Sequence, residues 1–474
     1  MPRLVLFDLN TSFDWKFLLA ALLLITMQAL SPGAQSKERV LSDRVTENSF
    51  SSDPNRDDLF NNDKKILLEC IKIIRFNVKF HEEANRRWWW RDWLYPLEKE
   101  ASTGLTFANS VVDIRQRSRG LQNTDLISKV AQKKGLDCAI TGHALGGMAS
   151  TLELAQNGLV VLRARKNHFS PKQSVAFVKS GVDIIDKLLI DRERILALDV
   201  SSDQYQVRVL QGRLLKHIRN QVVFEFTQWS VNSREVEWRE NTFYAIDALQ
   251  NFTSMGSSIT SLHNLTASNL GEEAAVSSLV AHSLETLNPL IRTFAGACIG
   301  KYQRWHLSKV FPQDKPRTMK QLLNDWTELD SLISSSKLSN DESLRELAFL
   351  VRKSQNFDGP LDDEVKSIEH LRRVADQQAI SGPLIGLTKV AESSCDLVAE
   401  NGYASDVSNR IKLAGKISDA SGQGYSLLAT PTAKALHYRY TKRLSRQGKL
   451  PSQIMHERLI KLDQLEAKIE AARP

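Results

Sequence analysis

The sequence predicts an all-α protein, and three observations support this. Apolar residues recur at helical spacing, and proline stands at or near the start of several such segments, where it favours the first helical turn. No long stretch alternates with a period of two, and the one β-like run, residues 221–226, lies in a charged segment that is equally compatible with a helix. The first apolar stripe of the chain comprises Leu67, Cys70, Ile71, Ile74 and Val78.

Composition is that of a folded protein with a sizeable core. The chain has 474 residues, of which 42% are hydrophobic and 25% are charged. This length accommodates about two to four ordinary domains or one long array. The net charge of +8 permits contact with anionic lipid, but no block of six like charges occurs, so we expect no nucleic-acid partner.

The N-terminus predicts export. Residues 17–30 form a continuous apolar run of signal-peptide length, shorter than the roughly 20 residues that span a bilayer. Small residues follow at 34–36, at plausible cleavage positions, so residues 1–36 are interpreted as a signal peptide. An uncleaved anchor formed by residues 17–30, or a buried helix of a cytosolic protein, are the alternatives. We therefore expect the periplasm, cell envelope or extracellular space, with membrane anchoring left open.

A linker is predicted between this segment and the folded part. Residues 37–62 are rich in Ser, Asp, Asn and Arg and poor in apolar side chains. Such a composition favours an extended or disordered segment. Order is expected to begin near Asp63.

Self-similarity predicts two to three diverged repeats of about 140 residues. The segments that begin near Pro171 and Pro316 share spaced apolar positions at a shift of 144 residues, and a weaker echo begins at Pro451. Each follows a small-residue run and a basic stretch. The period is longer than that of common solenoids, which favours duplicated helical hairpins or bundles. The predicted copies are 63–205, 206–345 and 346–474.

Residues 140–150, ITGHALGGMAS, resemble the nucleophile elbow of the α/β-hydrolase lipases, whose pattern is GHSLGG after a strand. In that family the serine in this pattern attacks the ester, and here Ala144 takes its place. The resemblance therefore implies at most a lipase-like pseudoenzyme without acyl transfer. Flanking segments that read as helix, and no series of parallel strands, argue against it.

Small residues in this run and in a second one predict close helix packing. Glycines spaced four apart let a neighbouring helix approach its partner's backbone. The same runs are candidates for membrane-inserted hairpins, although Asp137, His143 and Glu153 would be costly in lipid. The packing positions are Gly142, Gly146, Gly147, Ala295, Gly296 and Gly300.

One aromatic and basic segment is a candidate membrane-surface or partner contact. Indole rings favour interfaces, and arginines suit anionic headgroups. The alternative is a helix packed inside a bundle, with arginines stacked over indoles. The residues are Arg86, Arg87, Trp88, Trp89, Trp90, Arg91 and Trp93.

Four widely spaced cysteines give no metal site. Cys70, Cys138, Cys298 and Cys395 lack the CxxC spacing of zinc ligands, and the histidines are scattered. Two disulfides in any of three pairings, or buried free thiols, remain open. No catalytic, metal or cofactor constellation is predicted.

Taken together, these patterns predict a non-catalytic structural or interaction protein of the cell envelope or extracellular space. The partner is an unspecified protein or a membrane surface, and the oligomeric state is left open. A membrane-active helical protein that inserts its small-residue hairpins is the first alternative. The lipase-like pseudoenzyme is the second.

Overall fold

The all-α prediction is confirmed. The computed structural model describes residues 54–85, 91–123, 126–198, 205–266, 270–311, 385–400 and 403–471, with Thr327 and Ser331. These ranges are helical except for short connections, and none of them contains a strand. Residues 221–226, the β-like run, are part of a helix. The predicted signal peptide 1–36 lies outside the described residues.

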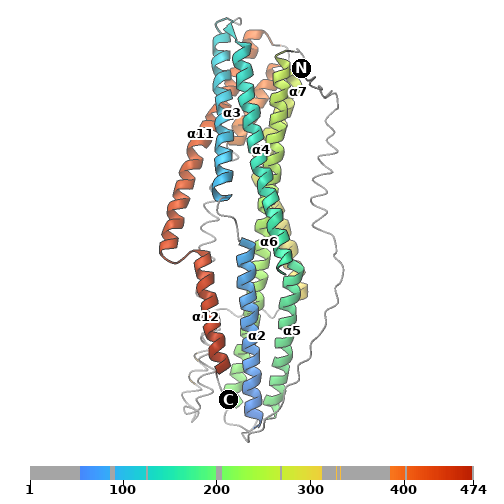
Figure 1. Ribbon diagram of the computed structural model, residues 1–474. Helices are drawn as coiled ribbons and strands as arrows, with labels where there is room; N and C mark the ends of the chain where they lie inside the picture. Colours follow the sequence, from blue (N-terminus) through green and yellow to red (C-terminus); the bar gives the residue numbers. More distant parts are fainter. Residues whose placement is uncertain are drawn as a thin grey trace, which may run out of the picture. The chain divides into compact units, whose positions relative to one another are not determined.

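Eight helices have defined bounds (Figure 1). They are α2 (Pro54–Asn85), α3 (Arg91–Gly120), α4 (Lys129–Lys166), α5 (Pro171–Ala197), α6 (Tyr205–Asn264), α7 (Gly271–Val310), α11 (Ser405–Arg446) and α12 (Pro451–Ala471). Residues 385–399 are helical as well.

The predicted linker ends earlier than expected, because α2 begins within it. This helix begins at Pro54, so residues 54–62 are helical, although a linker was predicted up to residue 62. Proline has the backbone angle of a first helical turn, and Asp57 in that turn complements the helix dipole. Leu59 and Phe60 are buried, so the tail of the polar segment supplies core residues.

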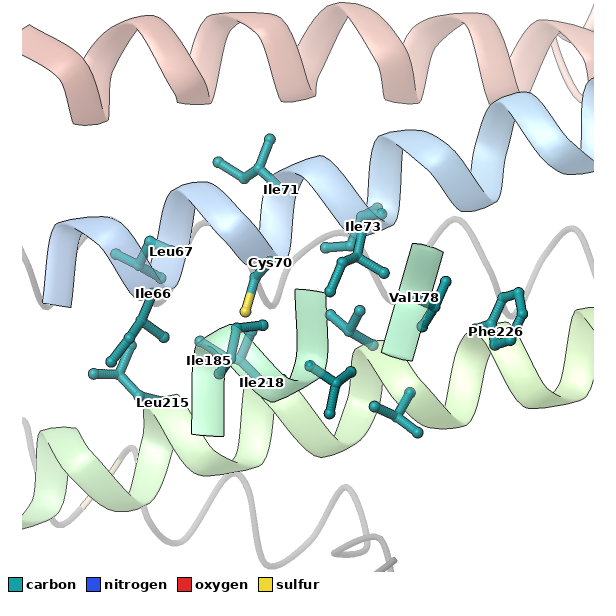
Figure 2. Packing of buried hydrophobic residues seen from close by; sticks show 14 of the residues in the cluster. Ile66, Leu67, Cys70, Ile71, Ile73, Val178, Ile185, Leu215, Ile218 and Phe226 are labelled. Carbon is teal, nitrogen blue, oxygen red and sulfur yellow. The ribbon is translucent and has the colours of Figure 1, made fainter. Parts of the chain in front are cut away.

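An apolar core joins α2, α5, α12 and the first half of α6. Figure 2 shows Cys70 of α2 pointing toward Ile218 of α6, whereas Ile71 points to the opposite side of α2, toward α12. The predicted stripe of α2 is buried throughout. Fully enclosed side chains from these four helices include Ile66, Ile73, Ile185, Leu214, Leu215, Phe226, Leu462 and Leu465.

Two buried ion pairs cross this apolar core. Arg192 of α5 donates from Nε to Asp63 of α2 at 2.6 Å. Arg458 of α12 binds both carboxylate oxygens of Glu225 of α6, at 2.6 and 3.0 Å. A buried charge without its partner is strongly destabilising. Each ion pair therefore fixes the register of the two helices that it joins.

The remaining helices pack around a polar interior. The second half of α6 lies against α4 and α7, and α3 lies against α4 and α11. Residues 385–399 join α7 to α11 through the ion pairs of Lys389 with Glu285 and of Glu392 with Lys416. Buried charged and hydroxyl groups, rather than large aliphatic side chains, fill this second bundle.

Two of the short connections have the same geometry. His168 before α5 and Gly448 before α12 have φ angles of 63° and 68°, each three residues before a helix-starting proline. This left-handed residue ends a helix and lets the next begin. In the first connection, Phe169 N donates to Ala164 O (2.8 Å) and Ser170 N donates to Gln173 Oε1 (3.4 Å). In the second, Lys449 N donates to Leu444 O (2.9 Å) and Leu450 N donates to Gln453 Oε1 (3.3 Å).

All four cysteines are free thiols. Cys70 is buried, Cys138 and Cys395 are half-buried and Cys298 is exposed, so the interpretation of four buried thiols is wrong for Cys298. In the ranges that the structure describes, no helix combines the length and apolar character needed to cross a bilayer.

Candidate functional site

A cavity of about 200 Å³ lies inside the polar bundle. It is bounded by α3, α4, α6, α7, residues 385–400 and α11. One buried water requires roughly 15 Å³ on this measure, so the space is large enough for a small organic molecule. Its lining side chains include Asp113, His143, Ser254, His282, Lys389, Glu392, Asp396, Lys416, Asp419 and Gln423.

Lys416 is the centre of the charged lining. Its ammonium group pairs with Glu392 and lies 3.7 Å from a carboxylate oxygen of Asp113 and 3.7 Å from one of Asp396. Burial favours the neutral amine, but these carboxylates prevail and raise the pKa of Lys416 well above its ordinary value. Lys416 is therefore a permanent cation that links three helices.

Three other titratable groups of the cavity are held neutral. Burial raises the pKa of Glu392 to about 8, despite the opposing effect of Lys416. Burial and the charge of Lys389 lower the pKa of His282 to about 4. His143 on α4 has its pKa lowered well below the ordinary value, again mainly by burial. At pH 7 the cavity thus contains one protonated carboxyl and two neutral imidazoles.

Five buried polar atoms around the cavity have no hydrogen-bond partner among the described residues. Polar atoms removed from water without a partner cost roughly 1–3 kcal/mol each, so such atoms call for an explanation. All five side chains line the one cavity. The atoms are Asn109 Oδ1, Arg117 Nε, Ser254 Oγ, Asp396 Oδ1 and Gln423 Oε1.

One end of the cavity reaches helix ends. Gln132 is in the first turn of α4, Asn264 ends α6 and Gly271 begins α7, and all three are cavity-lining residues. Glu400, which follows the helical residues 385–399, also lines the cavity and is exposed. The lining therefore extends to the ends of three helices, whereas His282 and Gln423, also in the lining, are buried.

A serine, a histidine and a glutamate meet beside the cavity but do not form a catalytic triad. Ser393 Oγ lies 2.7 Å from His282 Nδ1, and Glu392 Oε2 lies 4.0 Å from the same nitrogen. In a working triad the acid and the serine use different ring nitrogens. Here the Lys389 carbonyl also accepts from Nδ1, at 3.1 Å, and Ser393 is fully buried. The arrangement orients His282 and activates no nucleophile.

The glycines singled out in α4 lie in tight helix contacts. A Cβ atom at Gly142 would be 2.9 Å from the carbonyl oxygen of Ser102 in α3, and one at Gly147 would be 2.8 Å from the ring of Phe252 in α6. Gly146 lies against Ser102 and Asn251. The α3–α4–α6 contact therefore depends on small residues at these positions.

The second small-residue run occupies a similar contact. Gly296 and Gly300 of α7 are buried against Arg239 and Glu235 of α6. Ala295, next to them, is half-buried. None of the six small residues singled out in the two runs lines the cavity. Their contacts position the helices that form its walls.

The local geometry contradicts the lipase resemblance. Residues 140–150 are helical throughout and belong to α4, and strands are absent from the described ranges. The strand–turn–helix of a nucleophile elbow is therefore not formed, because the glycines serve helix packing and not a sharp turn.

The aromatic and basic segment is largely untested. Residues 86–90, which contain Arg86, Arg87, Trp88, Trp89 and Trp90, lie outside the described residues. Arg91 and Trp93 belong to the first turn of α3.

No protein family, curated protein or solved structure matches the chain.

The charged cavity residues were missed by the sequence prediction. Lys412, Lys416, Asp419 and Gln423 recur at spacings of four, three and four along α11, and Lys389, Glu392, Asp396 and Glu400 recur similarly. This periodicity was the available signal. Because a polar stripe at helical spacing is also the mark of a solvent-exposed face, it did not identify a buried site.

Substituting Gly142 should destabilise the protein, whereas the same change at Gly158 should not. Gly142→Ala forces a methyl group against the α3 backbone, and we expect a loss of about 1–3 kcal/mol in the free energy of unfolding. Gly158 is also in α4, has no atom within 4 Å of a built Cβ, and should gain about 0.5–1 kcal/mol as alanine. Urea unfolding measures both. Equal effects would contradict the close contact.

Stability should fall as the pH rises from 6.5 to 8. Folded Glu392 keeps its proton to about pH 8, but the unfolded residue loses it near 4.5, so its contribution is fully present below pH 4.5 and is lost as the pH rises through 8. His282 acts oppositely, but only between about pH 4 and 6.5. We expect the wild type to lose about 1–2 kcal/mol more than Glu392→Gln over this interval. Urea unfolding of both proteins at the two pH values measures this, and equal slopes would refute it.

Proposed function

We propose that this protein is an exported, non-catalytic helical binding protein that holds a small polar molecule in the cavity of its polar bundle. This proposal adds a binding site to the interaction protein of the cell envelope or extracellular space that the sequence predicts. The export part rests on the apolar run at residues 17–30 and the small residues at 34–36.

One observation carries the binding proposal: five unpartnered polar atoms surround a space large enough for an organic solute. Ser254 and Gln423 are 3% and 5% exposed, so bulk water does not satisfy them. Buried charged and hydrogen-bonding groups that serve only the fold normally have partners within the protein. Convergent polar groups in a cavity of a helical bundle are typical of a ligand site.

The chemistry of the lining favours binding over catalysis. His282, the base nearest a hydroxyl, has its pKa lowered to about 4 and is therefore a weak proton acceptor at neutral pH. Ser393 is fully buried and is not a cavity-lining residue, so it meets no substrate. Lys416 is held as a cation and is not a nucleophile.

Binding is also favoured over membrane insertion of the small-residue runs. The faces of α4 and α7 that carry Gly142, Gly146 and Gly296 are covered by α3 and α6. Insertion would require these contacts to be exchanged for lipid, with Asp137 and Glu153 carried into the bilayer.

A repeated helical unit is also part of our proposal, and the paired connections support it. The turns at His168 and Gly448 share a left-handed residue, two hydrogen bonds and a following proline at a shift of 280 residues. Gly135 and Gly142 of α4 correspond at the same shift to Gly415 and Gly422 of α11. The segment near Pro316 lies outside the described residues.

A solute that occupies the cavity should raise the melting temperature. We expect at least one member of a panel of amino acids, sugars, amines and carboxylates to stabilise the full chain by about 2–3 kcal/mol at a hundred times its Kd, a shift of a few degrees. Ser254→Leu, which places an apolar side chain in the cavity, should abolish the shift. Ser233→Leu, on α6 but away from the lining, should keep it. A panel without any effect at millimolar concentration would refute the binding site.

Export predicts a processed N-terminus. The mature chain recovered from cells should begin near residue 37, and a carbonate wash should release it from membranes, because no helix in the described ranges is long and apolar enough to cross a bilayer. N-terminal sequencing and intact mass measure the cleavage site. A chain that begins at Met1 and stays in the membrane pellet would instead support an anchor at residues 17–30. A chain that begins at Met1 in the cytosol would refute export.

A further inference from the structure

We infer that the cavity selects an elongated aliphatic amine with at least two ammonium groups, such as a short diamine or linear polyamine. This inference rests on the proposed binding function and specifies its ligand class. Four features of the lining support it: the length of the cavity, its charge, the kind of unpartnered atoms and its apolar walls.

The cavity lining is extended along α11. It runs from Lys412 to Gln423, which at 1.5 Å per residue corresponds to roughly 16 Å along the helix. A linear molecule can contact the whole of such a lining, whereas a compact molecule contacts only part of it.

The lining carries more negative than positive charge. Five carboxylates line the cavity, from Asp113, Glu392, Asp396, Glu400 and Asp419. The four lining cations are Arg117, Lys389, Lys412 and Lys416, and Lys389 is also neutralised by Glu285, 3.0 Å away and outside the lining. Even with Glu392 protonated, four carboxylates face three remaining cations. A cationic guest balances this excess in a site where water screens little.

Most of the unpartnered atoms are acceptors. Asn109 Oδ1, Asp396 Oδ1 and Gln423 Oε1 can only accept hydrogen bonds, and they come from three different helices. An ammonium group supplies donors only, which matches them. Arg117 Nε is the one donor without acceptor ability, and it belongs to the last turn of α3. Three of the five unpartnered atoms therefore require a donor from a guest.

Apolar side chains also line the cavity. Leu136 and Ala139 of α4 and Ala274 and Ala275 of α7 are part of the same lining. They offer contact surface for methylene groups but no hydrogen bond. A lining that combines polar acceptors with apolar surface suits a chain of methylenes that carries ammonium groups.

A bare metal ion is a poorer match. Within the described ranges, no three acidic, histidine or cysteine side chains are arranged to hold one. The ammonium group of Lys416 already lies among Asp113, Glu392 and Asp396, where an ion would otherwise be held. The unpartnered oxygens are distributed along the cavity, and this suits an extended guest.

Three molecules of equal length separate the charge classes. Isothermal titration of the full chain with 1,4-diaminobutane, butane-1,4-diol and succinate should show binding of the diamine, with the diol and the dicarboxylate at least tenfold weaker. If the diol or succinate binds as well or better, the cavity remains a ligand site but the amine inference is wrong. If none of these, and no member of the broader panel, binds, the proposed function fails as well.

Two isosteric changes in opposite directions test the site itself. Asp396→Asn removes one lining charge and should weaken the diamine about tenfold, whereas Asn109→Asp adds one and should strengthen it several-fold. Asp406→Asn, at an exposed position in the first turn of α11, is the matched control and should change nothing. Diamine affinities that do not follow the lining charge in folded variants, verified by circular dichroism, would overturn the inference.

Discussion

One ammonium group holds the polar bundle together. Lys416 of α11 lies among Asp113 of α3 and the carboxylates of Glu392 and Asp396, so three helices share one cation. Without it, these carboxylates would face each other in a buried space, where unpaired charges are strongly destabilising. The close approach of α11 to residues 385–399 serves the same contact, since Gly415 lies against the backbone of Glu392. The position of Lys416 thus fixes the width of the cavity.

The two bundles divide the physical tasks of the molecule. Around α2, α5 and α12 the interior is aliphatic and aromatic, and burial of that surface is the main source of stability. Around α3, α4, α7 and α11 the interior contains charges and unpartnered polar atoms, which lower stability unless something else compensates. The buried side chains of the apolar bundle offset this cost.

Apolar periodicity in the sequence identified the first bundle but not the site. The stripe from Leu67 to Val78 was predicted and is buried. The glycines at 142, 146 and 147 were placed correctly on a helix, because glycines four residues apart typically allow two helices to pack closely. Lys389 and Glu392 were not recognised, since a helical stripe of charges has the same pattern whether it faces solvent or a cavity. Only the packing of α11 against residues 385–399 decides which face is inside. The linker boundary was missed because Leu59 and Phe60 stand among polar residues that mask a helix start.

Helix α6 is common to both bundles, and its continuity has a mechanical consequence. Its 60 residues form one helix that supplies Leu214, Leu215 and Phe226 to the apolar core and Ser254 and Ser257 to the cavity lining. An α-helix of this length is a stiff rod of roughly 90 Å. Any tilt of α6 at the cavity would therefore displace its opposite terminus, inside the apolar core.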